Sequence, residues 1–291
     1  MPSFVVGEEF DGITVKAFLR RYCNVSARLL TKLKRTENGM TVNGKTVRSI
    51  DILRAGETIE LVFPSDECFI EPVEMPLDIV FEDNDIIVLN KPPFMPVHPV
   101  HEHQLDTLAN GVMFYSRSRG ENYTFRPVNR LDRDTSGLVT AAKNSYAHSF
   151  LSSNVRKKYT ALCEGRLDGS GTIDMPIRLK EGHTIQREAG DGGVRAVTHY
   201  SAVKYAFGHT LLSLTLETGR THQIRTHLSY IGHPLAGDEM YGGSRRYFSR
   251  QCLHCGELEL IHPISREVIV LKREAEDWLG ELENIFNAQG Y

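Results

Sequence analysis

The sequence lacks any long apolar run. None of its 291 residues lie in a segment approaching the roughly 20 consecutive apolar residues that a membrane-spanning helix requires. The start of the chain, MPSFVVGEEFDGITV, lacks the basic and then apolar stretches of a signal peptide. No GxGxxG dinucleotide fingerprint occurs. With 41% hydrophobic and 24% charged residues, the composition predicts a globular, cytoplasmic protein without membrane contact.

Cysteine is also scarce, with five residues in the whole chain. Their scatter excludes a disulfide framework and favours a reducing compartment. Only Cys252 and Cys255 have the spacing of metal ligands, with His254 between them. A tetrahedral zinc ion would need two further ligands, and no second CxxC exists. We therefore expect buried thiols and no metal.

Positive charge is concentrated near the N-terminus. The net charge is −3, yet residues 12–48 contain nine lysines and arginines and one acidic residue. Such a segment can be a solvated face, but at this density it favours a polyanionic partner, above all a nucleic acid. Within it, Val15–Tyr22 has apolar residues at helical spacing, and Ser26 can cap a second helix. An Asn43-Gly44 turn then separates two short strands, and Thr58–Phe63 reads as a third.

These N-terminal residues resemble the RNA-binding domain typified by the small-subunit ribosomal protein S-four. The resemblance lies in ITVKAFLRRYCNVSARLLTKLKR, MTVNGKTV and LRAGETIEL. It implies an RNA-binding domain over residues 1–64, in which the helix pair and the hairpin face the RNA. The candidate phosphate contacts are Arg20, Arg21, Arg28, Lys32, Lys34 and Arg35. Alternatively, about half of these cations only keep an amphipathic helix soluble.

Residues 65–76 read as an acidic, proline-bearing linker, and residues 77–291 as a second domain rich in short strands. The expected strands are Asp78–Phe81, Ile86–Leu89, Leu138–Ala142, Tyr159–Cys163, His199–Tyr205, Leu211–Leu216 and Val268–Leu271. The expected helices are Ala147–Ser153, Thr221–Tyr230 and a C-terminal one with Trp278, Leu282, Ile285 and Phe286. This ratio predicts a mixed α+β fold: a large domain with a mainly antiparallel sheet flanked by helices, preceded by a small α+β domain.

The segment Arg126–Leu138 carries unusual chemistry for a connection. Arg130 and Arg133 flank Asp132, and a Thr-Ser-Gly turn follows. Opposite charges nearby favour the ionised carboxylate, which can then act as a nucleophile or a base. By spacing alone, a surface salt-bridge cluster is the favoured explanation of the same residues.

The run NRLDRDTSG, residues 129–137, is similar to the HRLDxxTSG signature of RluA/RluD-type pseudouridine synthases. The resemblance assigns the catalytic aspartate to Asp132 and not to Asp134. Asn129 departs from the pattern, because histidine is the family's commonest residue there. Asparagine keeps the capacity to form hydrogen bonds.

Two further segments extend the resemblance. VRKKYTALCEG matches the strand whose tyrosine packs against the target base, here Tyr159, and LTLETGRTHQIRTHL matches a turn and helix that deliver an arginine to the aspartate, here Arg225. If the helix begins near Thr221, His222 and Arg225 share a face that can meet a phosphate or carboxylate. A zinc site of His222 with two later histidines, at positions 227 and 233, is disfavoured by their divergent spacing.

Shorter matches cover most of the remaining chain. KPPFMPVH, residues 91–98, resembles a K-P-x-G-x-x-V-H segment, with Phe94 in place of the glycine. CLHC and LIHP resemble two turn segments with structural roles.

The resemblance implies an isomerase that converts uridine in RNA to pseudouridine. This reaction needs no redox change, so we expect no cofactor. Asp132 is the candidate nucleophile or base, Arg225 its ionic partner, Tyr159 a stacking surface and proton acceptor, and Arg130 a filler of the gap in the RNA. Large-subunit ribosomal RNA is the first candidate substrate, transfer RNA the second, and a monomer is expected. The rival functions are a non-catalytic RNA-binding or ribosome-assembly factor and an N-glycosidase.

Overall fold

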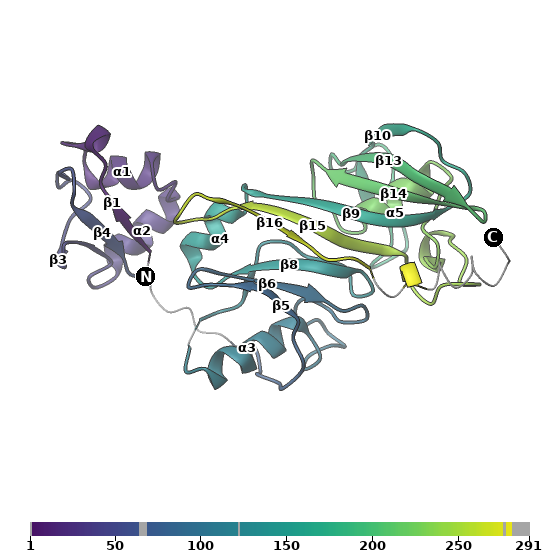
Figure 1. The fold of residues 1–291 in the computed structure, drawn as a ribbon, viewed down its shortest axis with the longest axis horizontal. Coiled ribbons are helices and arrows are strands. Elements are labelled where there is room, and N and C mark those ends of the chain that lie inside the picture. Colours follow the sequence, from purple (N-terminus) through teal and green to yellow (C-terminus); the bar gives the residue numbers. More distant parts are fainter. Residues whose placement is uncertain (1, 64–68, 122, 276–277, 281–291) are drawn as a thin grey trace.

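The computed structural model describes residues 2–63, 69–121, 123–275 and 278–280. Its N-terminal part is a small four-stranded antiparallel sheet in the order β1-β4-β2-β3, with two helices beside it (Figure 1). The elements are β1 (Ser3–Val5), the 3-10 turn η1 (Glu8–Phe10), α1 (Val15–Arg21), α2 (Ala27–Arg35), β2 (Met40–Val42), β3 (Lys45–Thr46) and β4 (Thr58–Leu61). The two predicted helices and three strands are therefore present.

Local sequence explains these elements. The side chains of Thr14 and Ser26 accept hydrogen bonds from backbone N–H groups in the first turns of α1 and α2, as N-caps do. Asn43 and Gly44 both have positive φ and close the β2–β3 hairpin. Residues 39–46 also have the GxxxxGKT spacing of a phosphate-binding loop. They form this hairpin and not the strand–loop–helix unit that such a loop requires, so the spacing is coincidental.

The larger part of the chain forms a ten-stranded sheet in the order β10-β13-β14-β9-β15-β8-β6-β5, with β16 beside β15 and β7 beside β8. Among the strands of the described residues, only β15 and β8 pair in parallel, so the predicted mainly antiparallel sheet is confirmed. The strands are β5 (Ile79–Glu82), β6 (Ile86–Lys91), β7 (Arg126–Pro127), β8 (Ser136–Ala142), β9 (Val155–Glu164), β10 (Ser170–Asp174), β13 (Val197–Ala206), β14 (His209–Leu216), β15 (Leu253–Ile261) and β16 (Val268–Lys272). A separate hairpin joins β11 (Ile177–Leu179) to β12 (Arg187–Ala189).

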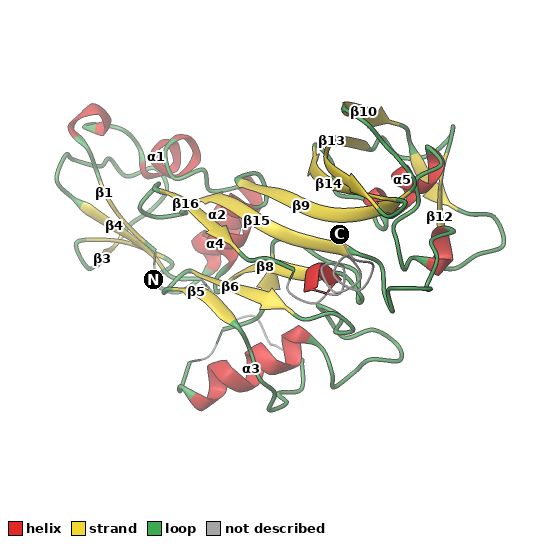
Figure 2. Cartoon of the chain, turned by 45° about the vertical axis from the view of Figure 1, so that its right-hand side comes forward, coloured by secondary structure: helices red, strands yellow, loops and turns green. Residues whose placement is uncertain are grey.

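Helices lie on both sides of this sheet (Figures 1 and 2). They are α3 (Leu108–Ser118), α4 (Ser145–Leu151), α5 (Gln223–Tyr230) and the 3-10 turn η2 (Glu239–Tyr241). The sequence did not predict α3, because Asn110-Gly111 resembles a turn. Asn110 instead completes a capping box with Thr107, and a Cβ at Gly111 would lie 2.6 Å from the Met75 side chain. A close contact, not a turn, accounts for this glycine.

The sequence also did not predict the short strands β1, β7, β10, β11 and β12 or the longer β15, although β15 lies between β9 and β8 near the middle of the sheet. Its second half alternates Glu257 and Glu259 with buried leucines, and these acids face Lys272 and Arg156 on neighbouring strands. The expected C-terminal helix with Leu282, Ile285 and Phe286 lies outside the described residues, as does Cys68. Cys23, Cys163, Cys252 and Cys255 are buried free thiols, as predicted. The described helices include none that is long and apolar enough to cross a membrane.

The N-terminal sheet and helices pack directly on the larger part. Tyr146 of α4 is fully buried within the N-terminal hydrophobic cluster. Its hydroxyl donates a hydrogen bond to the Cys23 carbonyl at 2.6 Å and accepts one from Arg266 at 3.1 Å. Arg266 also donates to the Tyr22 carbonyl. These contacts hold the basic helices at one end of the molecule (Figure 1).

Candidate active site

The loop from Val128 to Thr135, which we call the Asp132 loop, connects β7 to β8. Asn129 is buried and fixes its start: the side-chain amide donates to the Leu138 carbonyl and its oxygen accepts from the Thr140 N–H. Asn129 thus pairs with β8 as a strand neighbour would. At the end of the loop, Gly137 has φ +114°, and a Cβ there would lie 2.4 Å from the Cys255 carbonyl oxygen. Glycine is required at this close approach.

An ion-pair chain joins the Asp132 loop to α5. Arg225 Nη1 donates to Asp132 Oδ2 at 3.2 Å, while its Nε and Nη2 donate to the two oxygens of Asp238 at 2.7 and 2.8 Å. Burial opposes the charge of Arg225, but the hydrogen bonds and charges of Asp238 and Asp132 outweigh it and raise the pKa of Arg225. The guanidinium is therefore a fixed cation that orients the Asp132 carboxylate.

His222 approaches the same oxygen of Asp132 as Arg225 does, with its Nε2 3.9 Å from Asp132 Oδ2. The expected helix start near Thr221 was wrong: α5 begins at Gln223, and His222 precedes it with a left-handed φ of 56°. The Tyr241 hydroxyl accepts from the Arg187 N–H and lies 2.9 Å from His222 Nδ1. Donation from Tyr241 to Nδ1 places the proton of a neutral His222 on Nε2, toward Asp132. Burial lowers the pKa of His222, which favours this neutral form.

Tyr159 of β9 completes the site from the sheet. Its ring lines a cavity of about 60 Å³ together with Asp132, Arg130, His222 and Arg225. Burial, followed by the neighbouring Cys255 and Asp132, raises the pKa of Tyr159 well above its usual value. Tyr159 is therefore a neutral phenol that presents a flat apolar surface beside the carboxylate.

Two buried basic side chains donate hydrogen bonds to the Asp132 loop and its neighbours. Lys91, which is fully buried, donates to the carbonyls of Pro92 and Arg133 at 2.8 and 3.0 Å. Arg250 donates to the Asp134 carbonyl at 3.0 Å and to the Ser136 hydroxyl at 2.9 Å. The sequence patterns assigned no role to either cation or to Asp238. Lys91 and Asp238 lie in or near segments with a family resemblance. The sequence has no signal, however, that shows Lys91 to be buried or Asp238 to pair with Arg225.

The chain matches the sequence profile described as RNA pseudouridylate synthase over residues 85–230, which span the Asp132 loop, Tyr159 and α5. This chain belongs to that family. It is 40% identical over 265 residues to the uncharacterized RNA pseudouridine synthase YjbO of Bacillus subtilis, covering 88% of this chain and 93% of YjbO. It is 35% identical over 288 residues to ribosomal large subunit pseudouridine synthase D of Pseudomonas aeruginosa, covering 90% and 87%.

Solved structures agree. Human RNA pseudouridylate synthase domain containing 1 superposes with a TM-score of 0.57 at 26% identity, covering 69% of this chain and 84% of the human one. The protein is therefore an RNA pseudouridine synthase, an isomerase.

The remaining predicted site residues are placed differently. In this pseudouridine synthase Arg133 pairs with Asp134 at 2.7 Å, so the cation that contacts Asp132 is Arg225 and not its chain neighbour. Arg130 is exposed at the cavity. The six N-terminal cations lie on α1 and α2, at the opposite end of the molecule from α5 (Figure 1). Arg20 is partly used within the fold, since it donates to the Val25 carbonyl at 2.6 Å.

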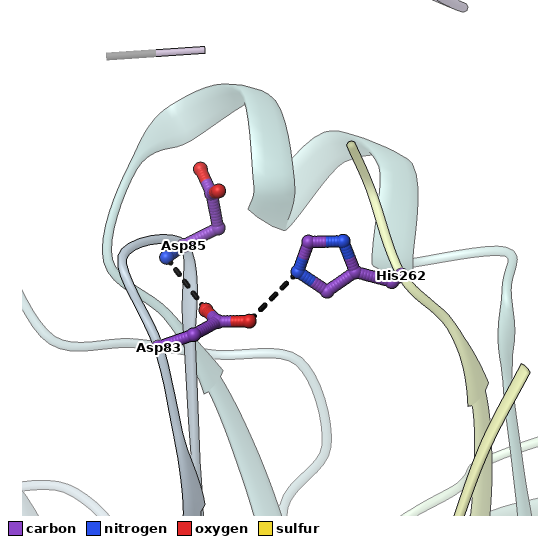
Figure 3. A group of neighbouring side chains, drawn as sticks. All are labelled: Asp83, Asp85 and His262. Atoms are coloured by element: carbon purple, nitrogen blue, oxygen red, sulfur yellow. Dashed lines mark hydrogen bonds and ion pairs between the residues drawn. The ribbon is translucent and has the colours of Figure 1, made fainter. Parts of the chain in front are cut away.

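The histidines considered for zinc have separate partners. His227 contacts the Thr198 hydroxyl and the Met175 carbonyl, and His233 contacts the Glu164 carbonyl. Another cluster, of Asp83, Asp85 and His262, has metal-like proximity (Figure 3). There His262 Nδ1 accepts two backbone N–H groups, which leaves its proton on Nε2 for Asp83 at 2.8 Å. Hydrogen bonds account for this cluster, which ties the β5–β6 turn to the segment after β15.

Proposed function

We propose that this RNA pseudouridine synthase modifies uridine in large-subunit ribosomal RNA, with Asp132 as its catalytic residue. The observation that carries the proposal is the Asp132 carboxylate, held by Arg225 beside the ring of Tyr159 in one cavity. The choice of RNA rests on relatives named ribosomal large subunit pseudouridine synthase D, such as that of Pseudomonas aeruginosa. Transfer RNA is the alternative substrate.

The geometry suits a reaction at the ribose of a flipped-out uridine. The bond from the anomeric carbon to N1 of uracil breaks, the base turns, and the same carbon bonds to C5, which loses its proton to N1 or solvent. Asp132 acts as a nucleophile or base at the ribose, and the fixed charge of Arg225 keeps it ionised and oriented. Tyr159 stacks on the base. Because burial raises the pKa of Tyr159, the phenol is a poor base, which weakens the expectation that it accepts a proton.

Arg130 and the N-terminal cations complete the proposal. Arg130 is exposed at the cavity, where it can fill the gap that a flipped uridine leaves in the RNA. The N-terminal helices, which resemble those of the S-four type, bind the phosphate backbone. Tyr146 docks this unit on the larger part, so one RNA must reach from α1 and α2 to Asp132.

The test is carbodiimide mapping of pseudouridine in total RNA from cells with and without this protein, restored by wild type or by Asp132→Asn. We expect defined uridines of large-subunit ribosomal RNA to lose the modification, and only wild type to restore it. Sites in transfer RNA would favour the alternative substrate. Rescue by Asp132→Asn of every phenotype, without any modified site, would favour a non-catalytic RNA-binding factor. Release of free uracil would indicate an N-glycosidase.

A further inference from the structure

The chain that leaves β6 runs beside the Asp132 loop. Lys91, the last residue of β6, is opposite Gly137 in the β6–β8 ladder. Its ammonium group binds the carbonyls of Pro92 and Arg133 together. Phe94 follows two residues after Pro92. The turn at Phe94 is therefore anchored to the same lysine as the residue that follows Asp132.

Phe94 has an unfavourable backbone conformation. Its φ is +63°, in the left-handed region that glycine adopts freely and that costs a bulky residue free energy. A turn with Pro93 before a residue of positive φ ordinarily has glycine or asparagine at that residue. The local turn therefore gives no reason for a phenylalanine.

Burial gives no reason either. The Phe94 side chain is 53% exposed, and among the described residues it belongs to none of the hydrophobic clusters. A single exposed apolar side chain is ordinary. An exposed aromatic residue with a strained backbone beside the Asp132 loop is unusual. Strain of this kind persists where function requires it.

The other non-glycine residues with positive φ have local reasons. They are Asn24, Asn38, Asn43, Phe207, His222 and Arg266. Asparagine tolerates this conformation. Phe207 lies with Gly208 in the two-residue turn between β13 and β14, where positive φ is required. His222 and Arg266 use their side chains to contact Tyr241 and Tyr146.

The surroundings of Phe94 indicate which kind of ligand its ring suits. Arg130 and Arg133 are exposed on the neighbouring Asp132 loop. Pro92, Pro93 and Pro96 restrict the segment, so little flexibility is lost when the ring contacts a ligand. A rigid, exposed aromatic ring, on a segment that Lys91 ties to a loop with exposed arginines, suits the stacking of an unpaired base. We propose that Phe94 is a stacking platform for an unpaired RNA base next to the target uridine.

This proposal rests on the proposed function. It also predicts the direction in which the backbone strain at Phe94 changes stability and RNA affinity. The left-handed Phe94 lowers the stability of the free protein and raises its affinity for RNA. Phe94→Gly removes both effects, so stability and binding should change in opposite directions. A purely structural phenylalanine would change them in the same direction.

The experiment uses a synthetic stem-loop that contains the mapped uridine, with 2-aminopurine at the base beside it. Affinity is measured with full-length protein carrying Asp132→Asn, so that no turnover occurs. We expect Phe94→Gly to raise the melting temperature and weaken binding about tenfold. Phe94→Leu should also weaken binding, whereas Phe94→Tyr should retain it. The 2-aminopurine fluorescence should be quenched by the Phe and Tyr proteins, and not by Gly or Leu.

Phe207→Gly is the matched control. It relieves the same backbone conformation just before the first residue of β14. The last residue of that strand, Leu216, lines the cavity and lies roughly 25 Å away along the strand. It should raise the melting temperature without changing RNA affinity. Equal affinity of Phe94→Gly and wild type, or of Phe94→Leu and Phe94→Tyr, overturns the stacking proposal alone. Absence of pseudouridine with wild-type protein overturns the proposed function, and the stacking proposal with it.

Discussion

The molecule has two groups of cations at its two ends, and they are built in opposite ways. Around Asp132, Lys91, Arg225 and Arg250 are buried and bonded to carboxylates or carbonyls of the fold. On α1 and α2, Arg21, Arg28, Lys34 and Arg35 are exposed to solvent. A buried, fully bonded cation holds neighbouring groups in place, whereas an exposed one is available for phosphate.

This difference means that the two groups should fail differently. Loss of a buried cation leaves its partners unpaired and costs stability as well as activity. Loss of an exposed cation costs affinity for RNA alone. Sequence proximity does not separate the two classes, since Arg133 is adjacent to Asp132 and yet pairs with Asp134.

The largest effects are expected at the Asp132–Arg225–Asp238 chain. Asp132→Asn should reduce activity below about one thousandth of wild type with little change in stability, because Asp132 is partly exposed. Arg225→Gln should abolish activity and also lower the free energy of unfolding by about 3–5 kcal/mol, because Asp238 is left buried without its partner. Urea unfolding and pseudouridine formation measure the two quantities.

A double variant separates these two losses. Arg225→Gln with Asp238→Asn removes the unpaired carboxylate, so we expect it to recover part of the stability and none of the activity. Recovery of activity together with stability would mean that Arg225 only supports the fold.

Lys91 should produce the next largest effect, with a characteristic pH dependence. Burial, aided by the charge of Arg250, lowers the pKa of Lys91 to about 7. The unfolded chain keeps this proton up to about pH 10.4. Between these values the unfolded state binds more protons, so stability gains from Lys91 as pH rises, by at most about 1.4 kcal/mol per pH unit.

Lys91→Met should remove this gain and, by freeing the Arg133 carbonyl, reduce activity roughly 10- to 100-fold. Urea unfolding from pH 6 to 9.5 compares the two proteins. Parallel profiles of stability against pH for variant and wild type would contradict the lowered pKa of Lys91. Lys143→Met is the control, since Lys143 is a largely buried lysine that pairs with Glu82 and Glu121 away from the Asp132 loop.

The sequence predicted the parts of the molecule that local patterns encode. The helix cap at Ser26, apolar residues at helical spacing and alternating apolar residues located the small unit and most strands. The motif around Asp132 and the arginine of α5 identified an ion pair between residues far apart in the chain. This pairing came from resemblance, because spacing alone cannot bring two distant segments together.

Tertiary contacts decided what the sequence did not predict. Helix α3 contains a glycine because Met75 packs against it, and β15 is central because β8 and β9 both pair with it. The start of α5 moved to Gln223 because His222 turns toward Tyr241 and Asp132. Lys91, Asp238 and Arg250 were missed for a similar reason: sequence suggests that charges are exposed, and only the fold shows which are buried.

The contact between α4 and the N-terminal unit gives a smaller prediction. Tyr146→Phe removes the hydroxyl that donates to the Cys23 carbonyl, which should weaken docking of the N-terminal unit by about 1–3 kcal/mol. Hydrogen exchange should become faster in α1 and α2 and stay unchanged in α5. Tyr115→Phe, which loses a hydroxyl bonded to Glu82, is the control and should leave α1 and α2 unaffected. Unchanged exchange in α1 and α2 of Tyr146→Phe would show that apolar packing alone holds the unit.

The smallest effects are expected from single exposed cations of the N-terminal helices. Replacing Arg21, Arg28, Lys34 or Arg35 by Gln should leave the melting temperature unchanged and weaken RNA binding a few-fold, uniformly across sequences. Removing a cation that binds a phosphate should lower the slope of log affinity against log salt by about 0.7–0.9. Arg117 is an exposed cation on α3. The control variant Arg117→Gln therefore makes the same change of charge away from the N-terminal helices. If it reduced the salt slope equally, net charge alone would attract the RNA, and the basic helices would not be a defined binding face.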